Sequence, residues 1–317
     1  MSILVLYIRQ PYPRLSHLQF SYYKQPGKKP DPTEEALSAL TQLERANNHP
    51  ALAEALPAFL RNRSPAVIAR AARLTVSLAL TPNLIEAFRK ILPDPVKRDP
   101  GCRALTAIST ALAAMEAPAA EIFAIGIRHQ QWEGSFGPPI DTAAGLRGIS
   151  AMGLVAIADP AALLACCDLL NDPEADARIG AIRALGASAK PEAELLLRFK
   201  AALGDKRSDV TSECFLNLLH LTPRTGVPYV ASFLESPNEE TAEAALWALA
   251  LSRHEAAIAC LLARLESAKF RQAVQVLEAL ALYKTDETRR AQVRQILDVR
   301  DDTQLEKLFA THWNRQS

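Results

Sequence analysis

The chain has 317 residues, a formal net charge of +1, 49% hydrophobic residues and 6% aromatic residues. Alanine and leucine, which favour helices, dominate it, and β-branched and aromatic residues are too few for an all-β fold. The hydrophobic content excludes disorder over most of the chain, and the balanced charge argues against a general binder of nucleic acid or anionic membranes.

Residues 1–33 differ from the rest because they are rich in basic residues, proline and tyrosine and show no helical period. The segment 26–32, with three prolines and a glycine, is typical of a linker. We expect residues 1–33 to form a poorly ordered leader. The alternative is a basic, aromatic arm that contacts a partner.

From residue 34 onward one pattern recurs, in which a leucine-rich stretch and a Ser or Asp turn precede an apolar core position. In the second half the core positions are Ile182, Phe215, Leu246 and Leu277, at spacings of 33, 31 and 31 residues. In the first half they are Leu74, Ile108 and Ile149, with steps of 34, 41 and then 33 residues to Ile182. The long step contains residues 130–139, which we interpret as a non-helical insertion between the two helices of one repeat.

Each repeat contains the start signals of two helices. Side chains that can cap a second helix are expected at its start: Ser64, Asp172, Asp205, Ser236 and Ser267. First helices are expected to start near Pro160, Pro191 and Pro228. Because such a unit cannot bury its apolar stripe alone, the pattern predicts stacked helix pairs.

The predicted fold is therefore all-α, an α-solenoid of about seven helix pairs over residues 34–301. Residues 302–317 are expected to hold a capping helix in which Leu305, Leu308 and Phe309 cover the last repeat. The core between successive second helices is predicted to include Ile182, Leu185, Phe215, Leu246, Leu249 and Leu277.

These units resemble HEAT repeats, and their shortness is similar to the HEAT-like repeats of the phycobilisome-lyase type. The family motif places Asp in the turn and Arg six residues later, forming a ladder between repeats. Asp172 with Arg178 and Asp141 with Arg147 match it. The C-terminal repeats depart from the motif, so stacking there is expected to depend on apolar packing.

The resemblance implies a function only weakly, because solenoids host unrelated activities. We expect a non-catalytic scaffold for protein–protein interaction. The alternatives implied by the family are a bilin-lyase-like protein and a glycosylase that excises alkylated bases from DNA. A structural subunit of a larger assembly is a third alternative.

The sequence contains no motif that indicates catalysis, a cofactor or a metal. The six histidines are scattered without metal-ligand spacing, and no nucleotide-binding or hydrolase motif is present. The cysteines have no paired spacing, so each is expected at a helix interface: Cys102, Cys166, Cys167, Cys214 and Cys260. Without an apolar run of membrane-spanning length or a signal peptide, we expect a cytoplasmic protein.

The resemblance places second helices on the concave side, where residues beside the core positions should point outward. The charged candidates shift from basic to acidic towards the C-terminus: Arg147, Arg183, Asp209, Glu213, Glu240 and Glu278. Leu216 and Trp247 are expected to form an apolar pair rimmed by Glu213, Glu240 and Glu243. Under the alternatives, the charges only aid solubility and Trp247 belongs to the core. The expected partner is a protein with a basic segment whose association rate falls with salt.

Overall fold

A computed structural model describes residues 31–78 and 80–313. Over these residues the fold is all-α, apart from one short two-stranded hairpin, as the composition predicts. Residues 1–30, on which the expectation of a poorly ordered leader rests, lie outside the described residues. No helix in the described part of the chain has the length and apolar character needed to cross a membrane.

The chain divides after Ser188 into two compact units, each built from helices that pack on their neighbours in sequence. The expected single repeat domain over residues 34–301 stays a prediction.

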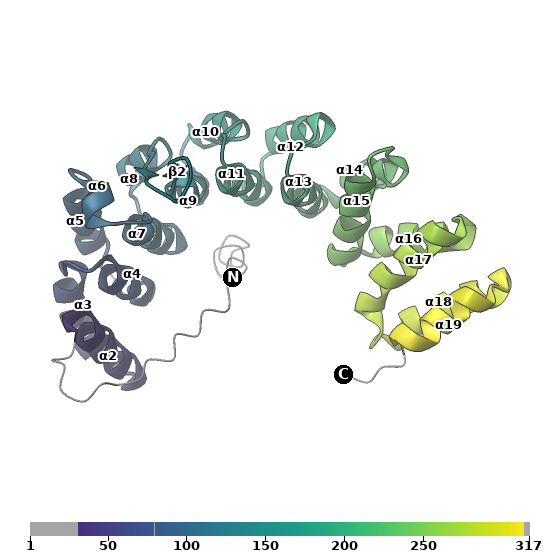
Figure 1. Ribbon diagram of the computed structural model, residues 1–317, viewed down its shortest axis with the longest axis horizontal. Helices are drawn as coiled ribbons and strands as arrows, with labels where there is room; N and C mark the ends of the chain where they lie inside the picture. The colour runs from purple at the N-terminus through teal and green to yellow at the C-terminus, as the bar shows by residue number, and fades with distance from the viewer. Residues whose placement is uncertain (1–30, 79, 314–317) are drawn as a thin grey trace. The chain divides into compact units, whose positions relative to one another are not determined.

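The first unit contains two rows of helices (Figure 1). Its helices are α2 (Pro32–Arg45), α3 (His49–Leu60), α4 (Pro65–Leu74), α5 (Thr81–Ile91), α6 (Pro95–Arg98), α7 (Arg103–Ala114), α8 (Ala120–Gly126), α9 (Ala144–Ala156), α10 (Ala162–Leu169) and α11 (Ala175–Ala187). Helices α4, α7, α9 and α11 pack side by side in chain order. Helices α3, α5, α8 and α10 each pack against the member of this row that follows them.

The second unit repeats this arrangement. Its elements are α12 (Pro191–Leu203), α13 (Ser208–Leu221), α14 (Pro223–Ser232), the 3₁₀ turn η1 (Phe233–Glu235), α15 (Glu239–Leu251), α16 (Glu255–Ser267), α17 (Phe270–Leu280), the 3₁₀ turn η2 (Ala281–Tyr283), α18 (Glu287–Arg300) and α19 (Thr303–Trp313). Helices α13, α15, α17 and α19 follow one another in one row, and α12, α14, α16 and α18 pack against them.

The six side chains predicted to form the core between successive second helices are buried, whereas Leu74, the first core position of the repeat, is half-buried. Each of the six side chains has at most 5% of its surface exposed: Ile182, Leu185, Phe215, Leu246, Leu249 and Leu277. The predicted register of the second helices is therefore confirmed at these positions.

The predicted starts of the second helices are wrong by two or three residues, except at Ser64, which directly precedes α4. Asp172, Asp205 and Ser236 accept hydrogen bonds from backbone N–H groups two residues further on, at 2.9, 3.0 and 3.2 Å. These side chains therefore form local turns, and the helices begin after them. Ser267 is the last residue of α16, so it does not cap α17.

Two further boundaries differ from the prediction. Helix α2 begins at Pro32, because Asp31 accepts a hydrogen bond from Thr33 N–H and proline fits the first turn. The expected leader therefore ends at least two residues earlier than residue 33. Helix α14 begins at Pro223 and contains Pro228, whereas α12 begins at Pro191 as predicted.

The predicted insertion is present between α8 and α9, as a hairpin of β1 (Trp132–Glu133) and antiparallel β2 (Ile140–Asp141). Its base is fixed by Glu133, whose carboxylate accepts hydrogen bonds from Gly101 N–H, the Gln131 amide and the Thr142 hydroxyl at 2.7, 2.7 and 2.8 Å. The insertion is thus attached to the loop before α7.

The cysteines only partly follow the expectation that each lies at a helix interface. Cys102, Cys166 and Cys214 are buried, and Cys260 is half-buried, but Cys167 is exposed. Cys166 of α10 points into the protein core, and the next residue along the helix points about 100° away from it. The expectation for Cys167 was therefore wrong.

Helix α19 covers the end of the second unit by packing on α17 and α18. Leu305 and Phe309 are buried and Leu308 is half-buried, in agreement with the predicted capping helix. Trp313 is also buried and stacks on Phe309, with ring centroids 5.1 Å apart. The helix therefore continues past Phe309 to Trp313.

Stacking in the second unit does not rest on apolar packing alone, as the missing Asp–Arg motif had suggested. Arg300 of α18 donates to the carbonyl groups of Leu265, Glu266 and Ala268 at 2.6, 2.9 and 2.9 Å. Arg264 of α16 donates to the Leu234 carbonyl at 3.1 Å. These arginines satisfy carbonyl groups that the end of the preceding helix leaves unpaired.

Candidate functional site

The structure overturns the prediction that Arg147 is exposed for binding. Its side chain is buried in the first unit, where it donates to Asp141 at 2.7 Å and to both carboxylate oxygens of Asp172 at 2.8 and 2.9 Å. It also donates to the His129 carbonyl at 2.9 Å. Asp141 is the last residue of β2, shortly before α9, and Asp172 lies in the turn before α11, so Arg147 joins two successive repeats.

The Arg147 pairing partly follows the ladder that the HEAT motif implies. Arg147 pairs with the Asp six residues before it, as the motif requires. Arg178 donates to the backbone carbonyl groups of Asp172 and Pro173 at 2.7 and 2.9 Å. Because the Arg147 guanidinium already donates to Asp141, Asp172 and the His129 carbonyl, it is not free to bind a partner protein.

The prediction for Arg147 was wrong because it assumed that the residue two positions before each core position points to the surface. Positions two before the core position lie about 200° around the helix from it. Helices α9, α15 and α17 each have a neighbour of the same row on both sides, so both positions can be buried. This is the case for Arg147 in α9 and Ala244 in α15, whereas Gln275 at the same position of α17 is exposed.

The remaining predicted residues lie on several helices of the two units. Arg183 of α11 and Glu213 of α13 are half-buried, and Glu213 accepts from the Asn217 amide at 3.0 Å. Asp209 is exposed and pairs with Arg207 at 2.6 Å. Glu240 of α15 and Glu278 of α17 are exposed.

Leu216 and Trp247 are both half-buried. Trp247 therefore fits neither the fully exposed binding residue nor the fully buried core residue that the sequence left as alternatives.

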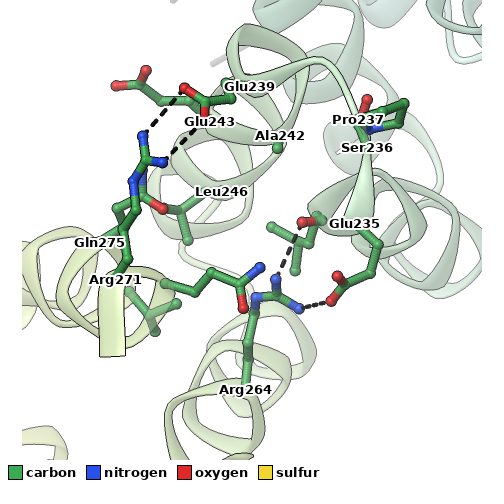
Figure 2. Close-up of a pocket in the computed structure, with 13 residues that line it drawn as sticks. Glu235, Ser236, Pro237, Glu239, Ala242, Glu243, Leu246, Arg264, Arg271 and Gln275 are labelled. Atoms are coloured by element: carbon green, nitrogen blue, oxygen red, sulfur yellow. Dashed lines mark hydrogen bonds and ion pairs between the residues drawn. The ribbon is translucent and has the colours of Figure 1, made fainter. Parts of the chain in front are cut away.

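A groove between α15 and α17 gathers charged and amide side chains in the second unit (Figure 2). It encloses about 290 Å³. The wall from α15 consists of residues at helical spacing: Glu239, Ala242, Glu243 and Leu246. The facing wall from α17 consists of Arg271, Gln272, Gln275 and Val276. We call this cavity the α15–α17 groove.

The floor of the α15–α17 groove is apolar. Leu234, Leu246 and Val276 have 8%, 5% and 1% of their surface exposed. At one end Arg264 pairs with Glu235 and donates to the Leu234 carbonyl, and both contacts appear as dashed lines in Figure 2. This end is therefore closed by polar contacts that belong to the repeat stacking.

An ion pair spans the mouth of the groove. The two terminal guanidinium nitrogens of Arg271, Nη1 and Nη2, contact the two carboxylate oxygens of Glu239 at 3.2 Å (Figure 2). The two side chains are 77% and 79% exposed, so water screens the pair strongly. Glu243, one turn further along α15, is exposed and has no ion-pair partner among the described residues.

The local sequence explains why the acidic side chains begin α15. Asn238 accepts a hydrogen bond from Thr241 N–H at 3.1 Å and caps the helix. Glu239 and Glu240 stand in the first turn, where the positive end of the helix dipole stabilises carboxylates. Arg271 similarly stands in the first turn of α17, so its ion pair with Glu239, which we call the clasp, joins the starts of the two helices.

The chemistry of the α15–α17 groove is that of a polar binding site. Carboxylates on one wall can hold a cation, and the Gln272 and Gln275 amides on the other can donate to and accept from a peptide backbone. No group of three or more His, Cys, Asp or Glu side chains in the described residues is arranged to hold a metal ion. Burial raises the pKa of the Cys102, Cys166 and Cys214 thiols to about 12, so they stay protonated at neutral pH.

Of the residues that the sequence predicted for binding, only Glu243, a member of the acidic rim, lines this groove. Sequence reasoning missed Arg271 and Gln275, although both precede the core position Leu277 on the side of α17 that faces α15. The available signal was Gln275, which occupies the position of Ala244 in α15. A polar side chain at this position indicates that the neighbouring helix does not pack tightly enough to bury it.

No protein-family model matches this chain, and no curated protein matches it significantly.

Proposed function

We propose that this protein is a non-catalytic scaffold built from HEAT-like helix pairs, and that the α15–α17 groove binds a basic segment of a partner protein. The repeat architecture is supported by the two helix rows in each unit and by polar contacts between residues one repeat apart. Examples are Gly101 with Glu133, Arg89 with Glu121, and Arg271 with Glu239, each separated by 32 residues.

The observation that carries the proposed binding role is the exposed, unpaired Glu243 beside an exposed clasp. Surface ion pairs such as Arg271 with Glu239 contribute about 0–1 kcal/mol. A lysine or arginine of a partner can therefore displace Arg271 from Glu239 at little cost while it also contacts Glu243. The α15 wall then carries two carboxylates for one incoming cation.

The size and lining of the groove favour an extended peptide. Its volume of about 290 Å³ is at the lower end of the range for ligand pockets, which suits one or two side chains. The apolar floor holds the aliphatic part of a lysine or arginine, whose charged end stays at the rim. Gln272 and Gln275 are placed to bond the backbone on either side.

Selection from a random peptide library on the full chain tests this proposal. We expect the selected peptides to be enriched in lysine and arginine and to lose binding to the variant Glu243→Lys. The matched control is Glu278→Lys, which makes the same charge change on an exposed site of α17 outside the groove. Peptides without basic residues, or equal loss with both variants, would show that the groove is not the binding site.

A further inference from the structure

Helix α12 has apolar stripes on two opposite faces. The inner stripe is buried and faces α13, and it consists of Ala193, Leu197 and Ala201. The outer stripe consists of Leu195, Phe199 and Leu203, which are 70%, 64% and 68% exposed. The stripes are offset by two residues, or about 200° around the helix. Three large apolar side chains exposed side by side on one helix face are unusual on a protein surface, so the outer stripe calls for a partner surface.

The outer stripe is particular to α12 within its row. On α16, the next helix but one in the same row, the exposed positions carry small or charged residues: Glu255, Ala256, Ala259, Ala263, Glu266 and Ser267. Three large apolar side chains at this spacing are therefore not a general property of the row.

The contacts of α12 with α14 keep the outer stripe facing outward. Tyr229 of α14 donates its hydroxyl to the Arg198 carbonyl at 2.9 Å. The Arg198 guanidinium lies over the Tyr229 ring, 4.4 Å from its centroid, and donates to the Thr225 carbonyl at 3.0 Å. With the inner stripe in the core as well, α12 cannot turn to bury Leu195, Phe199 and Leu203.

The outer stripe is symmetric about Phe199, since a leucine lies four residues before it and another four residues after it. We propose that α12 binds α12 of a second copy of this chain, antiparallel, with the two Phe199 side chains at a two-fold axis. Leu195 of each copy then packs against Leu203 of the other. Such self-complementarity is what an isologous interface requires.

The charges at the two ends of α12 complement each other in the same arrangement. Glu192 lies seven residues before Phe199, and Lys206 lies seven residues after it, just beyond the end of the helix. Both are exposed, and neither has an ion-pair partner among the described residues. In the antiparallel pair each Glu192 meets Lys206 of the other copy, whereas a parallel pair would place like charges together.

One helix stripe and its flanks cover less than the roughly 800 Å² per partner that a standard stable interface buries. The dimer is therefore weak and forms as the protein concentration rises. Sedimentation velocity on the full chain over a wide concentration range measures this directly. We expect reversible monomer–dimer exchange, and a chain that stays monomeric throughout would overturn the proposal.

The variant Phe199→Glu places two carboxylates at the axis and should raise the dimer dissociation constant at least about thirtyfold, as loss of a hot-spot residue does. Val299→Glu is the matched control, because Val299 is 83% exposed on α18 and lies outside the stripe. Dimers that form equally well with Phe199→Glu would contradict the interface.

Charge reversal tests the antiparallel arrangement separately. Glu192→Lys and Lys206→Glu should each weaken dimerisation, because each sets like charges against one another. The double variant should restore it by reversing both charges of each pair. Weakening that persists in the double variant would contradict the pairing of Glu192 with Lys206.

Discussion

Gly148 of α9 and Gly180 of α11 lie backbone against backbone. A methyl group added to Gly180 would lie 2.2 Å from the Gly148 Cα atom, and one added to Gly148 would lie 2.9 Å from the Gly180 Cα atom. The close approach brings the turn before α11 within reach of Arg147. Two glycines one repeat apart thus allow the buried ion network of the first unit to form.

We expect Gly148→Ala to lower the free energy of unfolding by about 1–3 kcal/mol, because the methyl group meets backbone atoms that cannot move aside. Gly145→Ala is the matched control on the same helix, since nothing lies within 4 Å of its added methyl group. It should be neutral or stabilise by up to about 1 kcal/mol, because alanine favours helices. Urea denaturation of both variants checks this, and equal effects would argue against the close packing of α9 on α11.

Arg147→Ala should destabilise the protein by about 3–5 kcal/mol, because it leaves two buried carboxylates without their cation. Arg183→Ala, at a half-buried site of α11, should cost less. Thermal or chemical unfolding measures both. If Arg147→Ala unfolded like the parent, Arg147 would be a surface residue after all.

Asp141 should make the protein less stable in acid. Burial alone would raise the pKa of Asp141, but hydrogen bonds from Gln131 N–H, Ala143 N–H and Arg147 outweigh it, so the pKa lies below its ordinary value. A lowered folded-state pKa gives stability that is present above the unfolded-state pKa of about 3.9 and is lost as the pH falls through the folded-state value.

The variant Asp141→Asn removes this dependence. We expect it to be less stable than the parent by about 1.5–3 kcal/mol at neutral pH, since it loses a charged hydrogen-bond partner of Arg147. Urea titrations at several pH values should show the difference shrinking below about pH 4. A difference that stayed constant with pH would rule out a stabilising charge on Asp141.

Leu249→Ala tests the repeat register of α15. Leu249 is fully buried, so its truncation should cost about 2–5 kcal/mol. Leu251, two residues further along, is 51% exposed, and Leu251→Ala should change stability by no more than about 0.5 kcal/mol. Similar costs for the two variants would mean that the predicted register is shifted.

The repeat period predicted the all-α fold and the buried side chains, because a stacked helix shows its core face as a regular pattern of large apolar residues. It predicted helix starts less well. Asp172 and Ser236 are residue types that serve equally in caps and in turns, and only the backbone conformation decides between these roles.

The candidate site was harder to predict, because it depends on how far apart two helices lie. Ala242 and Gln272 lie on the facing sides of α15 and α17. The amino-acid sequence does not give the distance between the two helices, so it does not predict the cavity between these residues. Arg147 shows the opposite error. The Asp–Arg motif already assigned it to a ladder, and treating it as a surface residue ignored that partner.

The most direct measurement of the proposed function is the affinity of one selected lysine- or arginine-containing peptide, measured by fluorescence anisotropy for the parent and two variants. We expect Glu243→Lys to weaken binding by at least about tenfold, a loss of about 1.4 kcal/mol, and Glu278→Lys to leave it nearly unchanged. Binding to the parent should also weaken as salt rises. If the peptide bound the parent and Glu243→Lys equally well, the α15–α17 groove would not be the site that holds the basic segment.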